Sequence, residues 1–125
     1  MFGFDMFKVF LYFRDLEKAK EFYRDILGFE EYRESEFVWQ YRVTPDCYIG
    51  LVGDGHGYFR AGDEKPVMPA MHLAPGQSIE EFFDYLVGSG VKVLDSEVRM
   101  FSDIAKVFLA KDTEGHVLEF IQRLK

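Results

Sequence analysis

The sequence lacks the features that would fix it in a membrane, hold it together by disulfides or attract nucleic acid. Cys47 is the only cysteine, so an internal disulfide is excluded and a reducing, cytoplasmic location is expected. No apolar run approaches the roughly 18 residues of a membrane span, and the start lacks the basic segment of a secretory signal. The 15 basic residues are outnumbered by 22 acidic ones, a net charge of -7, which argues against nucleic-acid and anionic-membrane partners.

The remaining composition is that of an ordinary globular chain with many aromatic residues. Apolar residues make up 48% and charged residues 30% of the 125 positions. A chain of this length fits one domain and can bury about two-thirds of its unfolded surface without a metal or disulfide. Aromatic residues reach 18%, with fourteen Phe, seven Tyr and one Trp, and offer stacking surfaces to a flat or cationic ligand.

Two amphipathic helices divide the chain into similar halves. Apolar residues recur at helical spacing from Leu16 to Leu27, directly after Asp15, whose carboxylate can cap the first turn. A second helix is predicted to begin after Ser78, which forms a capping box with Glu81. Strand-like runs precede the two helices, over residues 7–13 and 71–74.

Further strand-like runs follow each helix and complete the pattern. Three runs follow the first helix, over residues 29–33, 37–43 and 47–52, and four follow the second, over residues 91–94, 97–101, 106–110 and 117–122. We therefore predict an α+β fold of two tandem βαβββ modules within a single domain, residues 1–125. Module one covers about residues 1–52 and module two residues 70–125. Between them lies a connector, 53–69, with four glycines and two prolines.

Both ends of the chain resemble the vicinal oxygen chelate superfamily, the group of glyoxalase I, bleomycin resistance proteins and extradiol dioxygenases. The opening stretch joins a strand to Asp15-Leu-Glu, a helix bearing Phe22-Tyr23, and Leu-Gly28-Phe. The closing stretch has a turn at Gly115 followed by a strand that carries Glu119. The resemblance implies two modules that curve their sheets around a shared cleft for a small molecule, within a homodimer.

Enzymes of this superfamily hold a divalent metal with a His on the first strand of a module and a Glu or His on the last. In the first module those positions are Lys8 and Gly50, neither of which suits a metal. In the second, Glu119 matches, while Met71 takes the His position with His72 beside it. A one-residue slip would turn His72 into the cleft, and without it His72 lies against the helix. At most two ligands remain, where a catalytic site has three or four.

The loss of ligands favours a metal-free cleft that binds or sequesters an aromatic or cationic ligand, with no cofactor. Its expected lining residues are Lys8, Phe10, Tyr12, Trp39 and Glu119. Strand alternation alone leaves open which face of its strand Trp39 occupies. Lys8 would anchor an anionic group or pair with Glu119, unless it is an edge-strand charge that discourages sheet pairing.

The alternative is a divalent-metal-dependent lyase, isomerase or dioxygenase. His72 and Glu119 would hold nickel, zinc, manganese or iron, and the metal would polarise a carbonyl or enolate oxygen while Glu119 moves a proton. The structural reading of the same residues is that Glu119 is a half-exposed strand residue and His72 a core or edge histidine. His56 and His116, in the connector and in a turn, are expected to be solvated.

Overall fold

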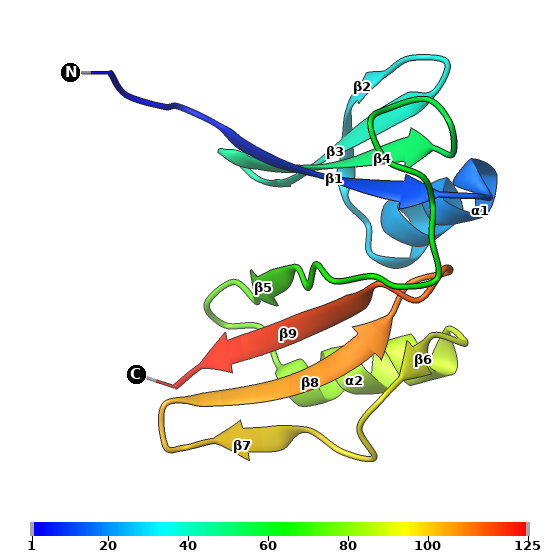
Figure 1. Ribbon diagram of the computed structural model, residues 1–125. Coiled ribbons are helices and arrows are strands. Elements are labelled where there is room, and N and C mark those ends of the chain that lie inside the picture. The colour runs from blue at the N-terminus through cyan, green and yellow to red at the C-terminus, as the bar shows by residue number, and fades with distance from the viewer. Residues whose placement is uncertain (1, 125) are drawn as a thin grey trace. The chain divides into compact units, whose positions relative to one another are not determined.

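The computed structural model describes residues 2–124 and divides into two compact units, with the boundary between Gly62 and Asp63. Each unit contains one sheet and one helical segment, so the predicted α+β class is confirmed (Figure 1). Among the described residues, no helix is long and apolar enough to cross a membrane.

The first unit is a four-stranded sheet with the strand order β1-β4-β3-β2. β1 runs parallel to β4, and the remaining neighbours are antiparallel. The helical segment follows β1 directly, as the sequence predicts. The elements are β1 (Phe7–Phe13), α1 (Leu16–Glu21), the π-helical turn η1 (Phe22–Ile26), β2 (Glu30–Glu34), β3 (Val38–Thr44) and β4 (Cys47–Gly53).

The first helix begins where the sequence predicts but changes its pitch before it ends. The backbone N–H of Lys18 donates to Asp15 Oδ1 at 3.2 Å, which confirms the cap. After α1 the chain widens into η1, where the N–H of Leu27 reaches the carbonyl of Phe22, five residues back, at 3.0 Å. Gly28 then ends the helix with a positive φ of 73°.

The second unit repeats this plan with one strand more. Its sheet has the order β5-β9-β8-β6, and β7 pairs with β8 beside that path. Ser78 caps the helix by accepting a hydrogen bond from the N–H of Glu81 at 3.2 Å. The elements are β5 (Ala70–His72), α2 (Ile79–Gly88), β6 (Lys92–Val93), β7 (Arg99–Phe101), β8 (Ala105–Lys111) and β9 (Val117–Arg123).

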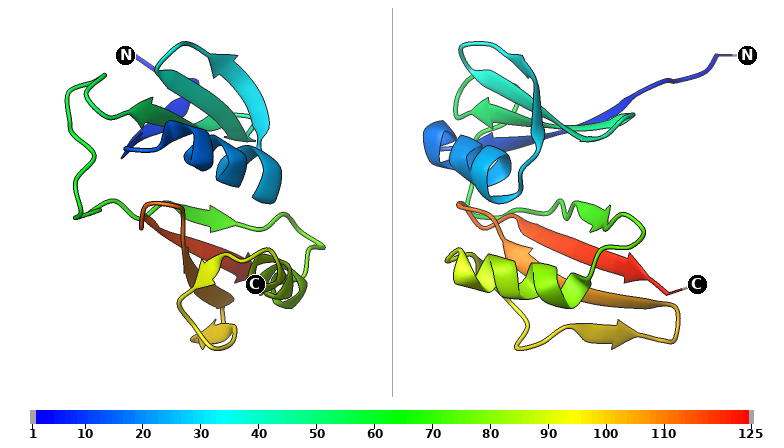
Figure 2. Two further views of the ribbon diagram at one scale, coloured as in Figure 1. Left: turned by 90° about the vertical axis from the view of Figure 1, so that its right-hand side faces the viewer. Right: turned by 180° about the vertical axis from the view of Figure 1, so that it is seen from behind.

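In each unit the core lies between the helix and one face of the sheet (Figure 2). Alternation along the strands sends every second side chain into this layer. The fully buried large side chains are Phe13, Tyr23, Tyr41 and Leu51 in the first unit, and Ile79, Leu86, Phe108 and Leu118 in the second. The other face of each sheet has no helix of its own unit against it, and we call it the open face.

His116, in the turn between β8 and β9, is buried, so the expectation that it is solvated is wrong. The carboxylate of Asp112, also buried, accepts hydrogen bonds from the backbone N–H groups of Glu114 and His116, both at 3.0 Å. Its second oxygen lies 2.9 Å from Nδ1 of the His116 ring. One buried carboxylate therefore organises the whole turn.

Candidate functional site

The open face of the second sheet is built by rows of paired residues on adjacent strands. His72 of β5 pairs with Ile121 of β9, and Ile121 pairs with Val107 of β8. Paired residues point to the same side of a sheet, as do residues two apart along a strand. Glu119, Ile121 and Arg123 therefore share this face. Phe120 points the other way, where its ring meets Phe82 of α2 at a centroid distance of 4.9 Å.

A cavity of about 340 Å³ lies on this open face. Val107, Ala105 and Ile121 form an apolar floor, and the exposed Phe101 and Ile104 stand at its side. The ionisable residues of the cavity are His72, Glu119 and Arg123, which come from two neighbouring strands. The structure thus brings the two predicted metal-site residues to one cavity.

The register of β5 settles which way His72 points. Met71 pairs with Phe120 and so lies on the helix side of the sheet, while His72 pairs with Ile121 and lies on the cavity side. Of the two arrangements that the sequence allows, the structure has the one that turns His72 toward Glu119. The strand begins one residue earlier than predicted, at Ala70.

Among the described residues, the three ionisable side chains of the cavity have no partner. Within residues 2–124, the side chains of His72, Glu119 and Arg123 make no hydrogen bond or ion pair with another residue. Ionisable groups that have no internal partner remain available to a ligand.

A second hollow of about 530 Å³ lies on the helix side of the same sheet, between α2 and β7. Its two cationic side chains are already neutralised by neighbours. Lys106 pairs with Glu80 at 3.2 Å, and Arg99 pairs with Asp95 at 2.7 Å. The cavity beside Glu119 is therefore the better candidate for a ligand site.

On the first unit's open face, three of the predicted residues are engaged with their own chain. Lys8 Nζ donates to Gln40 Oε1 at 2.7 Å. Phe10 covers its strand partner Gly50 with its ring. Tyr12 Oη accepts a hydrogen bond from the N–H of Tyr58 at 3.2 Å, and its ring meets Phe59 edge-on at 5.7 Å.

Trp39 does not lie with them, which corrects its nomination as a cleft residue. Trp39 pairs with Leu51 on β4, and Leu51 pairs with Leu11 of β1, so all three lie on the helix side of the sheet. The ammonium of Lys20, on α1, sits 3.4 Å from the centre of the indole ring. This contact is a cation–π interaction inside the core layer.

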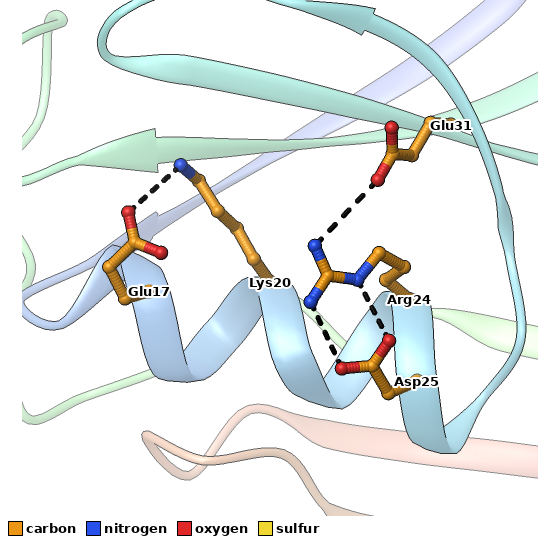
Figure 3. Close-up of polar contacts among 5 residues, drawn as sticks. All are labelled: Glu17, Lys20, Arg24, Asp25 and Glu31. Atoms are coloured by element: carbon orange, nitrogen blue, oxygen red, sulfur yellow. Dashed lines mark hydrogen bonds and ion pairs between the residues drawn. The ribbon is translucent and has the colours of Figure 1, made fainter.

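The charges around this helix are paired with each other. Lys20 is buried and reaches Glu17 at 3.2 Å, while Arg24 contacts Asp25 at 2.8 Å and Glu31 at 3.8 Å (Figure 3). The hydrogen bond to Arg24 lowers the pKa of Asp25 below its ordinary value. The contact between Arg24 and Glu31 joins the helical segment to β2.

The first part of the predicted connector is held together by its own hydrogen bonds. Asp54 accepts hydrogen bonds from Arg60 at 2.8 Å and from the N–H of Ala61 at 2.9 Å, and Ala61 is buried. The Arg60 guanidinium and that N–H hold the pKa of Asp54 well below its usual range. His56 is exposed, as expected, and stacks on Phe37 with a centroid distance of 3.6 Å.

Comparison with known proteins now decides the family. The family model of the Glyoxalase/Bleomycin resistance protein/Dioxygenase superfamily matches residues 5–120. The chain belongs to this superfamily. Its predicted resemblance is confirmed by a match that spans both units. A search of curated proteins found no match.

Several solved structures share the fold at low sequence identity. A lactoylglutathione lyase from Agrobacterium tumefaciens is 15% identical, with a TM-score of 0.73 over 94% of this chain and 92% of that one. A glyoxalase/bleomycin resistance protein/dioxygenase from Nocardioides is 20% identical, with a TM-score of 0.77 over 100% and 86%. An integron cassette protein from the Halifax Harbour sewage outfall is 22% identical, with a TM-score of 0.69 over 94% and 97%.

The described residues bring two of the predicted metal ligands to one cavity. His72 and Glu119 are two donors on adjacent strands, whereas a catalytic metal is usually held by three protein ligands. Among residues 2–124, no group of three or more His, Cys, Asp or Glu side chains is arranged to hold a metal ion.

Arg123 and Phe101 line the cavity but are not among the site residues predicted from the sequence. Arg123 follows Glu119 by four residues on β9, so the alternation that places Glu119 on the open face places Arg123 there too. That signal is present in the sequence. Phe101 could not be placed in the same way, because it reaches the cavity through the pairing of β7 with β8.

Proposed function

We propose that this protein binds a small organic molecule, with an apolar or aromatic body, in the cavity on the open face of the second sheet. The observation that supports the proposal is an apolar floor ringed by His72, Glu119 and Arg123, none with an internal side-chain partner among residues 2–124. The volume of about 340 Å³ falls in the range of small-molecule pockets, roughly 300–1,000 Å³.

Each part of the cavity has a separate role in this proposal. Ile121 and Val107 contact the apolar body, and Phe101 provides an aromatic surface at its side. Glu119, which the sequence predicts to line the ligand cleft, accepts hydrogen bonds from a donor or cationic group of the ligand. No resident metal or other cofactor is required for these contacts. The protein would act in the cytoplasm as a homodimer that binds or sequesters its ligand.

A second candidate function is favoured by the register of β5, which brings His72 and Glu119 to one cavity. It is that of a divalent-metal-dependent lyase, isomerase or dioxygenase. His72 and Glu119 would supply two ligands to nickel, zinc, manganese or iron. Because residues 2–124 place no third His, Cys, Asp or Glu beside them, further ligands would have to come from elsewhere.

A fluorescent dye tests the first proposal. N-phenylnaphthylamine has an aromatic body and no charge, and its emission rises in apolar surroundings. We expect Phe101→Ala and Ile121→Ala to weaken its binding about fivefold or more, because each removes apolar contact area. Tyr58→Ala removes an aromatic ring that is 98% exposed and lies outside the cavity, and should bind like the unmodified protein. Equal dye binding by all four proteins would refute the proposal.

Native mass spectrometry with nickel, zinc, manganese and iron in turn separates the two candidates. One metal per chain that is lost in both Glu119→Ala and His72→Ala would establish the metal-dependent alternative. Metal uptake that is absent, or unchanged in these variants, would remove that alternative and leave the metal-free cavity.

A further inference from the structure

We propose that the ligand of this cavity is an organic anion whose charged group pairs with Arg123. This inference rests on the proposed function and names the ligand class that the same cavity would select. It adds a binding residue that lies outside the pattern by which the family was identified.

The arrangement of the second sheet gives the cavity two electrically different ends. Glu119 and Arg123 lie four residues apart on the same face of β9. At roughly 3.3 Å per residue, their Cα atoms are about 13 Å apart. Ile121 lies between them. The cavity therefore runs from a carboxylate to a guanidinium past Ile121, with His72 beside it on β5.

Arg123 stands in one row with the aromatic side of the cavity. It pairs with Ala105 on β8, and Ala105 pairs with Phe101 on β7. With neighbouring strands about 4.8 Å apart, Arg123 and Phe101 are separated by roughly 10 Å across the small Ala105 side chain. An aromatic ring with an acidic substituent can place its face against Phe101 and its charge beside Arg123.

Arg123 also differs from four other arginines in its ion pairing. Arg24, Arg42, Arg60 and Arg99 each contact a carboxylate of the protein. In a chain with a net charge of -7, acidic partners are abundant. Arg123 nevertheless contacts none among residues 2–124. Its fork of donors fits the paired oxygens of a carboxylate, phosphate or sulfonate.

Electrostatics orient the ligand within the cavity. The negative charge of Glu119 repels an anion from its own end, so the charged group goes to the Arg123 end. An ion pair at an exposed arginine contributes little by itself. The apolar floor must therefore supply most of the affinity, and the selected ligands are those that combine an anionic group with an apolar or aromatic body.

Two dyes with the same aromatic body test this inference. Anilinonaphthalene sulfonate carries a sulfonate that N-phenylnaphthylamine lacks. We expect the sulfonate dye to bind more tightly, and Arg123→Gln to weaken it about twofold to fivefold while the neutral dye is unaffected. Lys92→Gln removes one positive charge at an exposed position on β6, outside the cavity, and should preserve the preference for the anion. Arg123 is itself exposed, and thermal unfolding would verify that Arg123→Gln keeps its fold.

The outcomes separate this inference from the proposed function. A preference for the anionic dye that is lost in Arg123→Gln and kept in Lys92→Gln supports both. If the neutral dye binds and depends on Phe101, but the anionic dye gains nothing from Arg123, the anion inference is wrong and the cavity stands. If neither dye depends on Phe101 or Ile121, the proposed function itself is overturned.

Discussion

The ring of Phe10 lies over Gly50, its partner on the neighbouring parallel strand, in the space that a side chain at position 50 would need. The second unit has the opposite arrangement, because Glu119 on its last strand pairs with Ala70 on its first. A large ring faces no side chain in one unit, and a carboxylate faces a methyl group in the other. The first unit thus covers its open face with its own residue where the second presents a charged group.

This relationship predicts that Gly50→Ala destabilises the protein. The new methyl group would collide with the Phe10 ring, which must turn out toward solvent, and we expect a loss of about 1–2 kcal/mol. In a Phe10→Ala background the obstacle is gone, and the same substitution should be neutral or stabilising by about 0.5 kcal/mol, since glycine inside a strand is unfavourable. Urea unfolding of the four proteins measures the difference. An equal cost in both backgrounds would show that the ring is not responsible.

The hydroxyl of Tyr41 is buried and has no hydrogen-bond partner among residues 2–124. A buried polar group without a partner is costly. Tyr41→Phe should therefore leave the free energy of unfolding at neutral pH unchanged or raise it by about 1 kcal/mol. Tyr58→Phe, at a residue that is 98% exposed, should have no effect. A substantial loss of stability in Tyr41→Phe would contradict this account.

Tyr41 also predicts how stability changes in alkali. Burial raises the pKa of Tyr41 above its ordinary value. Because the folded state holds this proton more tightly, the contribution to stability is complete below the unfolded pKa of about 10 and declines as the pH rises from there toward the folded value. The urea midpoint of the unmodified protein should fall as the pH is raised through about 10. The midpoint of Tyr41→Phe should fall less over the same pH range.

Asp54 predicts a corresponding loss of stability in acid. Its hydrogen bonds with Arg60 and Ala61 lower its pKa in the folded state. The contribution is complete above the unfolded pKa of about 3.9 and declines as the pH falls below it. Asp54→Asn should be less stable than the unmodified protein at pH 7, with a smaller difference near pH 3. The exposed residue Asp84, changed to Asn, provides the control.

The buried carboxylate of the β8–β9 turn predicts a graded series of variants. Asp112 accepts two backbone hydrogen bonds and lies against the His116 ring. Asp112→Ala leaves these donors without a partner and should cost about 2–4 kcal/mol, while Asp112→Asn keeps one acceptor and should cost less. Hydrogen exchange of the His116 amide would report the loss locally. Unchanged protection of this amide in Asp112→Ala would be inconsistent with the contact.

Local signals in the sequence were sufficient for the elements of the fold but not for the face that each side chain occupies. The caps at Asp15 and Ser78 depend on a few neighbouring residues, and both helices begin where those residues predict. Both faces of the first sheet carry aromatic residues. Alternation along β3 therefore cannot show whether Trp39 lies on the helix side or on the open face. Its position depends on α1, which supplies Lys20 to its ring.

The direction of His72 shows the same limit for a short edge strand. β5 has only three residues, too few for a pattern of its own. Its faces are decided by parallel pairing with β9, a partner almost fifty positions later in the chain. Such a long-range register is specified by the buried face of the complete sheet rather than by neighbouring residues. The sequence therefore allows two directions for the His72 side chain, and the pairing of β5 with β9 decides between them.

The division of the chain at Gly62 and Asp63 into units with separate buried layers has a consequence for how this protein can change over generations. A substitution on one sheet's open face need not disturb the other unit's interior. One unit can then keep its fold while the other acquires different residues on its open sheet face. Gly50 and Glu119 stand on the last strands of the two units, and one is covered by the Phe10 ring while the other lines a cavity.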